Sequence, residues 1–259
     1  MRFVITNKKG VENLYDPFYI CIKIFKGKNE ILSDRYHYFE FNTFNKTFKN
    51  FCLNITDDYI NLLCAKNNYV HTLESLKKNK LLLPENYCNA MRSASWHGHI
   101  NVLEWWKNSG LKLYYDDVFI IAAIYNHDNA IKVLEWFKNS GLPIESESEW
   151  VLNYASAYNN INILEWWKNS GLPLKYDENA IGLASSKSHI GVLEWWKNSG
   201  LELKYDNSIL DDASMNGHIN VLEWWKNSGL PLKYSQNLTT TNYADNVKEW
   251  WKNSGLPIN

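Results

Sequence analysis

A ten-residue pattern of hydrophobic and polar positions, VLEWWKNSGL at Val192–Leu201, recurs along most of the chain. With small changes it appears again at 102–111, 133–142, 163–172, 221–230 and 247–256. The glycine of the pattern advances in steps of 31, 30, 29, 29 and 26 residues. A period of this length is typical of stacked supersecondary units, none of which can bury its own hydrophobic face.

The repeated stretch has the spacing of an amphipathic helix. Its aliphatic pair and its two tryptophans fall on one apolar arc, and its acid and its lysine fall outside that arc. Gly200 is suited to the left-handed position that follows a helix end, and Lys197 lies in the last turn, where it complements the helix dipole. Four copies add a proline two residues after the glycine, which keeps the helix from resuming. The stretch therefore predicts a helix that ends at the glycine.

A shorter first helix is predicted in front of each copy. The clearest example runs from Asp177 to about Ser186, with the Asp177 carboxylate as the N-cap and the small residues Ala184 and Ser185 at its centre. A turn such as Ser188–His189 then leads into the second helix. Equivalent alanines precede the leucine of the second helix by nine residues at 94, 155, 184 and 213, and by eleven at 123. We expect about seven such units, of which the first and the last are degenerate.

Residues 1 to about 50 do not follow this period. Two segments, Tyr19–Phe25 and Tyr36–Phe44, are rich in aromatic and β-branched residues, and Lys26–Asn29 between them is turn-like. This pattern indicates short strands. We therefore divide the chain into an irregular N-terminal cap or small β element at 1–50 and a repeat array at 51–259.

The last unit is shorter than the others, because its glycine follows the previous one by 26 residues instead of 29. The usual Ala-Ser and Gly-His are missing from it, and a polar, imperfect terminal unit is typical of a cap. We expect the helix that carries Trp250 and Trp251 to dock on the preceding unit, and Ser235–Tyr243 to be the loosest part of the array.

The repeat resembles a known family. Its frame of Ala-Ser, Gly-His, Val-Leu-x-Trp-Trp and Gly-Leu is similar to the ankyrin repeat, and the likeness covers about four-fifths of the chain. Two features depart from that family: Asp177–Gly182 replaces its Thr-Pro-Leu-His start, and the loop between units, as in Leu201–Asp206, is about four residues shorter. The chain resembles the divergent Trp-rich ankyrin arrays of large DNA viruses and some lower eukaryotes.

This resemblance implies an all-α, ankyrin-like solenoid that lacks the long β-hairpin finger of the family. It also implies a non-enzymatic scaffold that binds a partner protein on its concave face, in the cytoplasm, or in the host cytoplasm if the chain is viral. An alternative is an adaptor that recruits a host ubiquitin ligase, through a motif that residues 1–50 would have to carry. An enzyme with a site assembled across units is a third interpretation.

Composition narrows the range of partners. With 27 Lys and Arg against 28 Asp and Glu and no basic block, the chain lacks the clustered charge that nucleic-acid binding requires. No apolar run approaches membrane-spanning length, and the start of the chain lacks the apolar core of a signal peptide. Four cysteines without a CxxC pair indicate free thiols in a reducing compartment. We expect a cytoplasmic monomer with a protein partner, no nucleic acid and no membrane.

Tryptophan is the most unusual component, with 13 residues, eleven of them in the repeated stretch. Such pairs could form an aromatic cage for a cation or a stacking platform for bases or sugars. However, adjacent helix positions point about 100° apart, so the two rings of a pair cannot line one pocket together. A binding site also usually differs between units, whereas these positions are nearly identical. We therefore interpret the pairs as a structural ladder buried between units.

No catalytic, metal or cofactor site is predicted. His99, His189 and His218 recur once per unit, which is too far apart to share a metal at bond lengths of about 2 Å. We interpret them as supports of the turn through hydrogen bonds. The sequence has no GxSxG, HExxH, GxxxxGK or GxGxxG motif. Acidic pairs at 57–58 and 116–117 lie at helix starts, where capping explains them, and Asp211–Asp212 is the one pair inside a first helix.

The positions that vary between units are the candidates for binding. The residues two before, two after and three after each equivalent alanine should face the concave side. They include large amphipathic side chains that differ from unit to unit, as interaction anchors do, although they could also fill gaps between first helices. The predicted partner-binding residues are Arg92, Trp96, His97, Tyr125, Tyr158, Lys187 and Met215.

Overall fold

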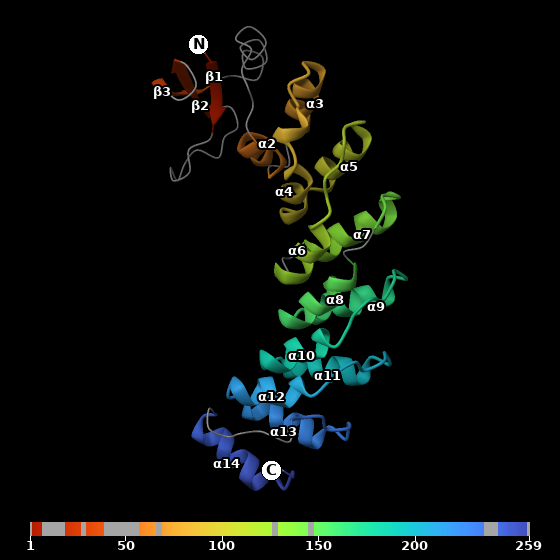
Figure 1. The fold of residues 1–259 in the computed structure, drawn as a ribbon. Helices are drawn as coiled ribbons and strands as arrows, with labels where there is room; N and C mark the ends of the chain where they lie inside the picture. Colours follow the sequence, from red (N-terminus) through yellow and green to blue (C-terminus); the bar gives the residue numbers. More distant parts are fainter. Residues whose placement is uncertain are drawn as a thin grey trace. The chain divides into compact units, whose positions relative to one another are not determined.

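The computed structural model describes residues 2–6, 19–26, 30–38, 57–65, 69–125, 129–144, 148–235 and 243–257 (Figure 1). The chain divides into two compact units, Met1–Val118 (unit 1) and Phe119–Asn259 (unit 2). The domain boundary expected near residue 50 lies outside the described residues. No helix within the described part of the chain is both long enough and apolar enough to cross a membrane.

Unit 1 begins with a three-stranded antiparallel sheet in the order β1-β2-β3. Its strands are β1 (Arg2–Thr6), β2 (Tyr19–Lys26) and β3 (Glu30–Tyr38). The strand expected at Tyr19–Phe25 coincides with β2. The one expected at Tyr36–Phe44 overlaps β3 only over 36–38, because β3 starts earlier than the aromatic residues suggest, and 39–44 lie outside the described residues. β1 was not predicted, although its sequence RFVIT carries adjacent β-branched residues.

From Asp57 onward, every regular element in the described part of the chain is helical. Pairs of short helices correspond to the repeats of the sequence, and the last, shortened repeat contains the single helix α14. The elements are α2 (Asp57–Cys64), α3 (Val70–Lys78), the 3-10 helix η1 (Pro84–Asn86), α4 (Ala90–Trp96), α5 (Ile100–Asn108), α6 (Val118–Tyr125), α7 (Ala130–Ser140), α8 (Ser148–Ala157), α9 (Ile161–Asn169), α10 (Asn179–Ser186), α11 (Ile190–Asn198), α12 (Ser208–Met215), α13 (Ile219–Asn227) and α14 (Asp245–Ser254).

The first helix of a pair starts slightly later than the sequence predicts. α10 begins at Asn179 and not at Asp177. Asp177 still satisfies the helix start, because its Oδ1 accepts the backbone N–H of Asn179 at 2.9 Å. Asp206 accepts the N–H of Ser208 in front of α12 in the same way, also at 2.9 Å. The prediction that Asp177 is the N-cap is therefore wrong, because Glu178 occupies that position and Asp177 bonds the first helical N–H from one residue further out.

The second helix ends as predicted. In α11 the Ser199 hydroxyl donates to the carbonyl of Trp196 at 2.8 Å and accepts the N–H of Leu201 at 3.1 Å. Gly200 between them has a φ of +75°, a left-handed conformation that a residue with a side chain rarely adopts. The Asn-Ser-Gly-Leu end of the repeat is thus a complete helix stop, which explains its uniformity between units.

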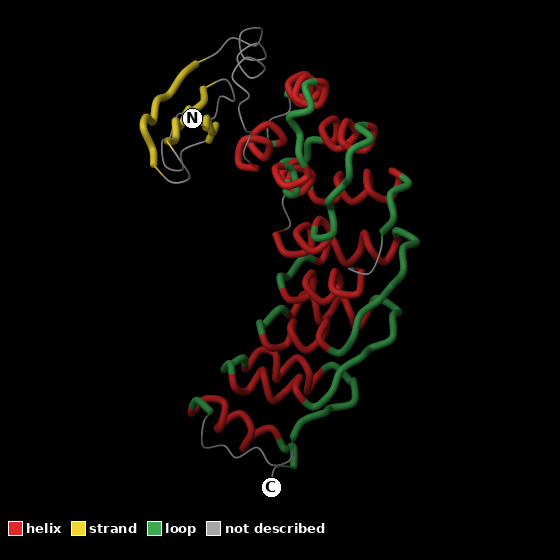
Figure 2. Tube along the Cα trace, turned by 45° about the horizontal axis from the view of Figure 1, so that its top comes forward, coloured by secondary structure: helices red, strands yellow, loops and turns green. Residues whose placement is uncertain are grey.

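In unit 2 the helix pairs lie side by side in chain order. α8 packs against α10 and α10 against α12, while α9, α11 and α13 neighbour one another. Figure 1 shows these first helices on one side of the unit and the second helices on the other, and Figure 2 shows the loops that join successive pairs along the edge of the second helices. Each pair therefore buries its apolar side against its neighbours.

The second tryptophan of each pair, which we call the inner tryptophan, is buried. The Trp196 indole N–H donates to Ser156 Oγ of the preceding first helix at 2.9 Å, and the Tyr176 ring lies 4.8 Å from the Trp196 ring. The same hydrogen bond joins Trp225 to Ser185 and Trp251 to Ser214. In unit 1, Trp106 donates to Cys64 Sγ. The predicted buried ladder is confirmed for the inner tryptophans.

The first tryptophan of each pair, the outer tryptophan, has different surroundings. Trp195 is half-buried and lies edge-on to Trp196, with the ring planes 83° apart. Its indole N–H donates to Glu165 Oε2 of the preceding second helix at 2.7 Å, and Asn169 donates to the other oxygen of that carboxylate at 2.7 Å. Equivalent bonds join Trp105 to Glu74, Trp166 to Glu135, Trp224 to Glu194 and Trp250 to Glu223. A second ladder of Trp–Glu bonds therefore links the second helices near the surface.

The histidines connect successive pairs instead of supporting only their own turn. His218 Nε2 lies 3.0 Å from the carbonyl oxygen of Ser186, at the end of the preceding first helix. His189 reaches the carbonyl of Ala157 at 3.1 Å in the same way. Asn160 replaces the histidine in front of α9 and donates to carbonyls at the end of α6. The expected hydrogen-bonding role is present, but its acceptor belongs to the neighbouring pair.

The shortened last unit contributes α14, which docks through buried Trp251. Besides the bond from Trp251 to Ser214 at 2.9 Å, the Tyr234 ring lies 5.2 Å from the Trp251 ring. The docking expected for this helix is confirmed. Most of the segment expected to be loosest, Ser235–Tyr243, lies outside the described residues.

Candidate binding surface

The three candidates of unit 1 lie on or just after α4. Trp96 is exposed at the end of that helix. Arg92 forms an ion pair with Asp117 at 2.9 Å, and both side chains are about half exposed. His97 Nδ1 lies 2.9 Å from the carbonyl of Ser93. Arg92 therefore already serves as a link to the residues in front of the next first helix.

The candidates of unit 2 lie at the C-terminal ends of its first helices. Tyr125 ends α6, Tyr158 follows α8 and Met215 ends α12, and their side chains are 57%, 45% and 67% exposed. Lys187 follows α10 and places its Nζ 4.3 Å from the centre of the Tyr158 ring, a cation–π contact between neighbouring pairs. The structure thus brings Tyr158 and Lys187 together.

α8 carries an aromatic stripe that the sequence interpretation missed. Trp150, Tyr154 and Tyr158 are spaced at i, i+4 and i+8, so they lie on one face of the helix. Trp150 and Tyr158 are exposed and Tyr154 is half-buried. Trp150 was not predicted, because it lies five residues before Ala155, outside the positions two before, two after and three after that alanine. The i+4 spacing of aromatic residues was the available signal.

The equivalent face changes character along unit 2. On α10, Leu183 and Lys187 occupy the positions of Tyr154 and Tyr158, and on α12 Asp212 occupies the first of them, next to exposed Met215. Burial, and then the nearby carboxylates of other aspartates, raise the pKa of Asp212. The surface therefore changes from aromatic over α8 to mixed polar and apolar over α12. We call it the first-helix face and define it by Trp150, Tyr154, Tyr158, Leu183, Lys187, Asp212 and Met215.

In unit 2, two of the side chains that stand two residues before an equivalent alanine join one helix pair to the next. Asn153 Nδ2 donates to Asp177 Oδ1 at 2.8 Å, in front of the next first helix. Asp211 does the corresponding work on α12, where it accepts the N–H of Ser235 at 3.0 Å and also the hydroxyl of that serine. These side chains fix the loop that follows, and they are less available to a partner than the sequence suggests.

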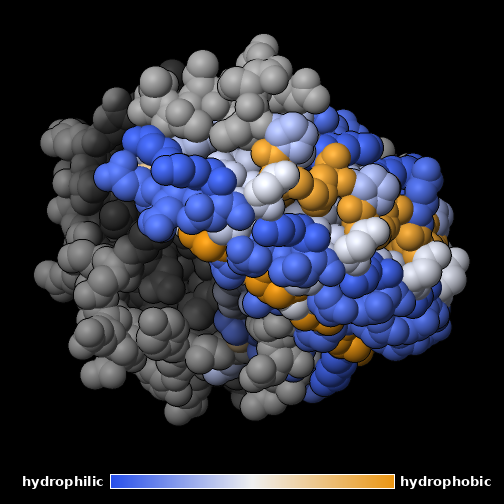
Figure 3. All heavy atoms as spheres, turned by 90° about the horizontal axis from the view of Figure 1, so that it is seen from below, coloured by the Kyte–Doolittle hydropathy of each residue, from blue (hydrophilic) through white to orange (hydrophobic). Residues whose placement is uncertain are grey.

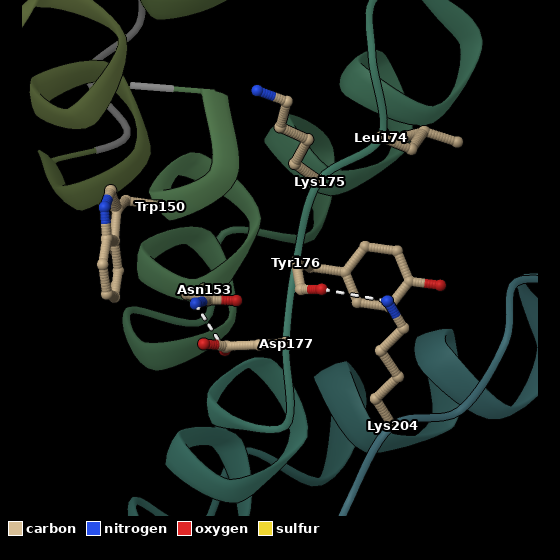
Figure 4. Close-up of a pocket in the computed structure, with 7 residues that line it drawn as sticks. All are labelled: Trp150, Asn153, Leu174, Lys175, Tyr176, Asp177 and Lys204. Atoms are coloured by element: carbon tan, nitrogen blue, oxygen red, sulfur yellow. Dashed lines mark hydrogen bonds between the residues drawn. The ribbon is translucent and has the colours of Figure 1, made fainter. Parts of the chain in front are cut away.

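A pocket of about 400 Å³ opens beside the aromatic end of this face (Figure 4). Trp150 and Asn153 contribute from α8, and the loop in front of α10 contributes residues 174–177. Lys204 reaches in from the following loop, where its Nζ lies 3.3 Å from the Tyr176 carbonyl oxygen and 4.8 Å from the centre of the Tyr176 ring. The lining residues are Trp150, Asn153, Leu174, Lys175, Tyr176, Asp177 and Lys204.

The surrounding surface is mixed. Seen from below, the coloured part of the molecule is mostly hydrophilic, with hydrophobic side chains in small groups between the polar ones (Figure 3). A surface of this kind suits a partner that is held by a few separate apolar anchors in a polar setting.

The described residues contain no group of three or more His, Cys, Asp or Glu side chains placed to hold a metal ion. Comparison of the chain with protein-family models, curated proteins and solved structures finds no match. The chemistry available on the first-helix face is that of stacking, cation–π contact and hydrogen bonding.

Proposed function

We propose that the chain is a non-enzymatic protein-interaction scaffold, an ankyrin-like solenoid that holds a partner protein against its first-helix face. The family resemblance of the sequence supports the solenoid, and so does the packing of each helix pair of unit 2 on the next. The loop between pairs at Gly200–Asp206 is also short, and it contains no strand. A scaffold that works in the cytoplasm is in keeping with the cysteines. Of the two whose side chains are described, Cys64 and Cys88, both are free thiols.

One observation carries the proposal. Among the described residues, seven large hydrophobic side chains are exposed, and four of them stand at the ends of first helices. Buried positions repeat almost unchanged from unit to unit, whereas these exposed ones differ in size and polarity. The packing of the helices gives no reason for a large hydrophobic side chain to be exposed to solvent, whereas the binding of a partner protein does. The four residues are Trp96 in unit 1 and Tyr125, Tyr158 and Met215 in unit 2, and the last two belong to the first-helix face.

Affinity capture with paired variants tests this proposal. The intact chain, a Tyr158→Ser/Met215→Ser variant and a Lys197→Ser/Lys226→Ser control are each used to retain proteins from a cell lysate. Lys197 and Lys226 are exposed on second helices, so the control alters the opposite layer of unit 2. We expect a protein that the intact chain and the control both retain and the first variant loses. Retention that depends only on the control positions would contradict the proposal.

A further inference from the structure

The pocket beside α8 combines an apolar wall with one unsatisfied polar atom. Trp150 is 42% exposed and Leu174 is exposed on the loop opposite it, so two apolar side chains line the opening. Asn153 is only 2% exposed, and its Oδ1 is buried without a hydrogen-bond partner. Figure 4 shows the Asn153 amide between Trp150 and the loop that carries Tyr176 and Asp177.

The free atom of Asn153 is an acceptor. Its Nδ2 donates to Asp177 Oδ1 at 2.8 Å, and because an ionised carboxylate can only accept, the amide cannot be turned the other way. The Asp177 carboxylate also accepts both the backbone N–H and the side-chain N–H of Asn179. A guest that completes this site must therefore donate an N–H or O–H to Asn153 Oδ1, and doing so relieves the cost of a buried unsatisfied acceptor.

The charges around the pocket exclude a cationic guest. Lys175 and Lys204 both line it, against the single carboxylate of Asp177, which already accepts three N–H groups. A guanidinium or ammonium group would meet two like charges there. A carboxylate would suit the lysines but has no hydrogen to donate to Asn153. The remaining class is an uncharged guest with a flat apolar body and one donor.

We infer that the pocket receives a tryptophan or tyrosine side chain of the partner protein, with its ring against Trp150 and its N–H or O–H bound to Asn153 Oδ1. This inference rests on the proposed function and names the anchor of the partner. Aromatic side chains with a polar group match the two requirements at once, because they bury a large ring and still need a hydrogen-bond partner for the donor. Asn153 Oδ1 is itself buried, so the surrounding side chains have to move before a guest can reach it.

Among the equivalent positions of α8, α10 and α12, only α8 combines an aromatic ring with a free amide oxygen. Gly182 stands on α10 where Asn153 stands on α8, and it offers no polar side chain. Asp211 stands there on α12, but both of its oxygens accept hydrogen bonds from Ser235. Asn179 and Ser208 replace the stacking ring of Trp150. A single anchoring pocket in an array of similar units would fix the register in which a partner lies along the first-helix face.

Two small probes test the inference on the unaltered chain. Indole has the ring and the N–H donor, and 1-methylindole has the ring without the donor. Each is titrated into ¹⁵N-labelled protein, and the indole N–H signal of Trp150 is followed by NMR after its assignment with Trp150→Phe. We expect indole to shift this signal, and 1-methylindole to bind about tenfold more weakly, because it leaves the buried acceptor unpaired. Equal binding of the two probes, or no shift at Trp150, would overturn the inference.

Variants separate the pocket from the rest of the surface. Asn153→Leu should abolish the difference between the two probes, and Trp150→Ala should weaken both. Asp211→Asn, at the equivalent position of α12, should change neither. Guanidinium chloride at matched ionic strength should not compete with indole, and competition would show a cation site instead. If the probes fail while Tyr158→Ser/Met215→Ser still loses the captured protein, the pocket inference is wrong and the proposed function stands.

Discussion

Each tryptophan pair places two identical side chains in different chemical surroundings. The inner ring of Trp196 is buried and bonded to Ser156, whereas the outer ring of Trp195 is half-buried and bonded to exposed Glu165. The sequence predicts the buried ladder, because near-identical aromatic positions at helical spacing indicate a core. It does not predict the bonding partners, because Ser156 and Glu165 stand 40 and 30 residues away and only the packing of the pairs selects them.

Trp196→Ala should lower the free energy of unfolding by about 3–5 kcal/mol, as the loss of a buried aromatic ring does. Trp195→Ala is the matched control and should cost clearly less, because its ring is already half in water. Urea unfolding of both variants, followed by circular dichroism, makes the comparison. An inner variant that kept its stability and lost a binding partner would place Trp196 in a binding site and contradict the structural ladder.

The outer ladder makes stability depend on pH. The Trp195 N–H, and then the Asn169 amide, hold the pKa of Glu165 below its usual value, and Trp224 and Asn198 do the same for Glu194. A depressed pKa in the folded state means that the contribution is fully present above the unfolded value of about 4.3 and is lost as the pH falls through the folded value.

We therefore expect the urea midpoint to fall below about pH 4.3. In Trp195→Phe the acid-dependent part of that fall should be smaller, because the donor to Glu165 is gone. Glu165→Gln serves as the control, since it can still accept the bond but does not titrate at this site. Identical pH profiles for the intact chain and both variants would show that the Trp–Glu bonds do not stabilise the fold.

At the scale of elements, the sequence predicted the helix pairs well and their edges less well. The stop at Gly200 was correct because one residue type fills a left-handed position. The start of α10 was placed two residues early, because the N-cap is Glu178, and Asp177 bonds the N–H of Asn179 from outside the helix. The acceptor of each histidine was also missed, because a carbonyl such as that of Ser186 carries no signal in the sequence.

The histidine bonds between pairs can be tested by substitution. His218→Ala should cost about 1–2 kcal/mol of unfolding free energy, because the part-buried carbonyl of Ser186 loses its partner. His218→Asn should cost less, because Asn160 already makes the equivalent bond in front of α9. Thermal unfolding of the two variants is the measurement. Equal losses in both would mean that the imidazole acts by packing and not by its hydrogen bond.

At the scale of the whole molecule, the variable positions of the repeat predicted some of the exposed side chains on the first helices and not others. Tyr125, Tyr158 and Met215 are exposed where the sequence placed them. Trp150 was missed because it lies three residues before Asn153, the first of the predicted positions on this helix. The free oxygen of Asn153 could not be predicted either, because it depends on how a loop 24 residues later folds back to bring Asp177 against it.

The central claim is that a partner protein lies on the first-helix face, and site-directed photo-crosslinking tests it most directly. A photoreactive p-benzoylphenylalanine is placed at Tyr158 in one protein and at Lys197, on a second helix, in another. Each is irradiated with the captured partner and analysed by mass spectrometry. We predict a crosslink to the partner from position 158 and none from position 197. A crosslink from position 197 without one from position 158 would contradict the account.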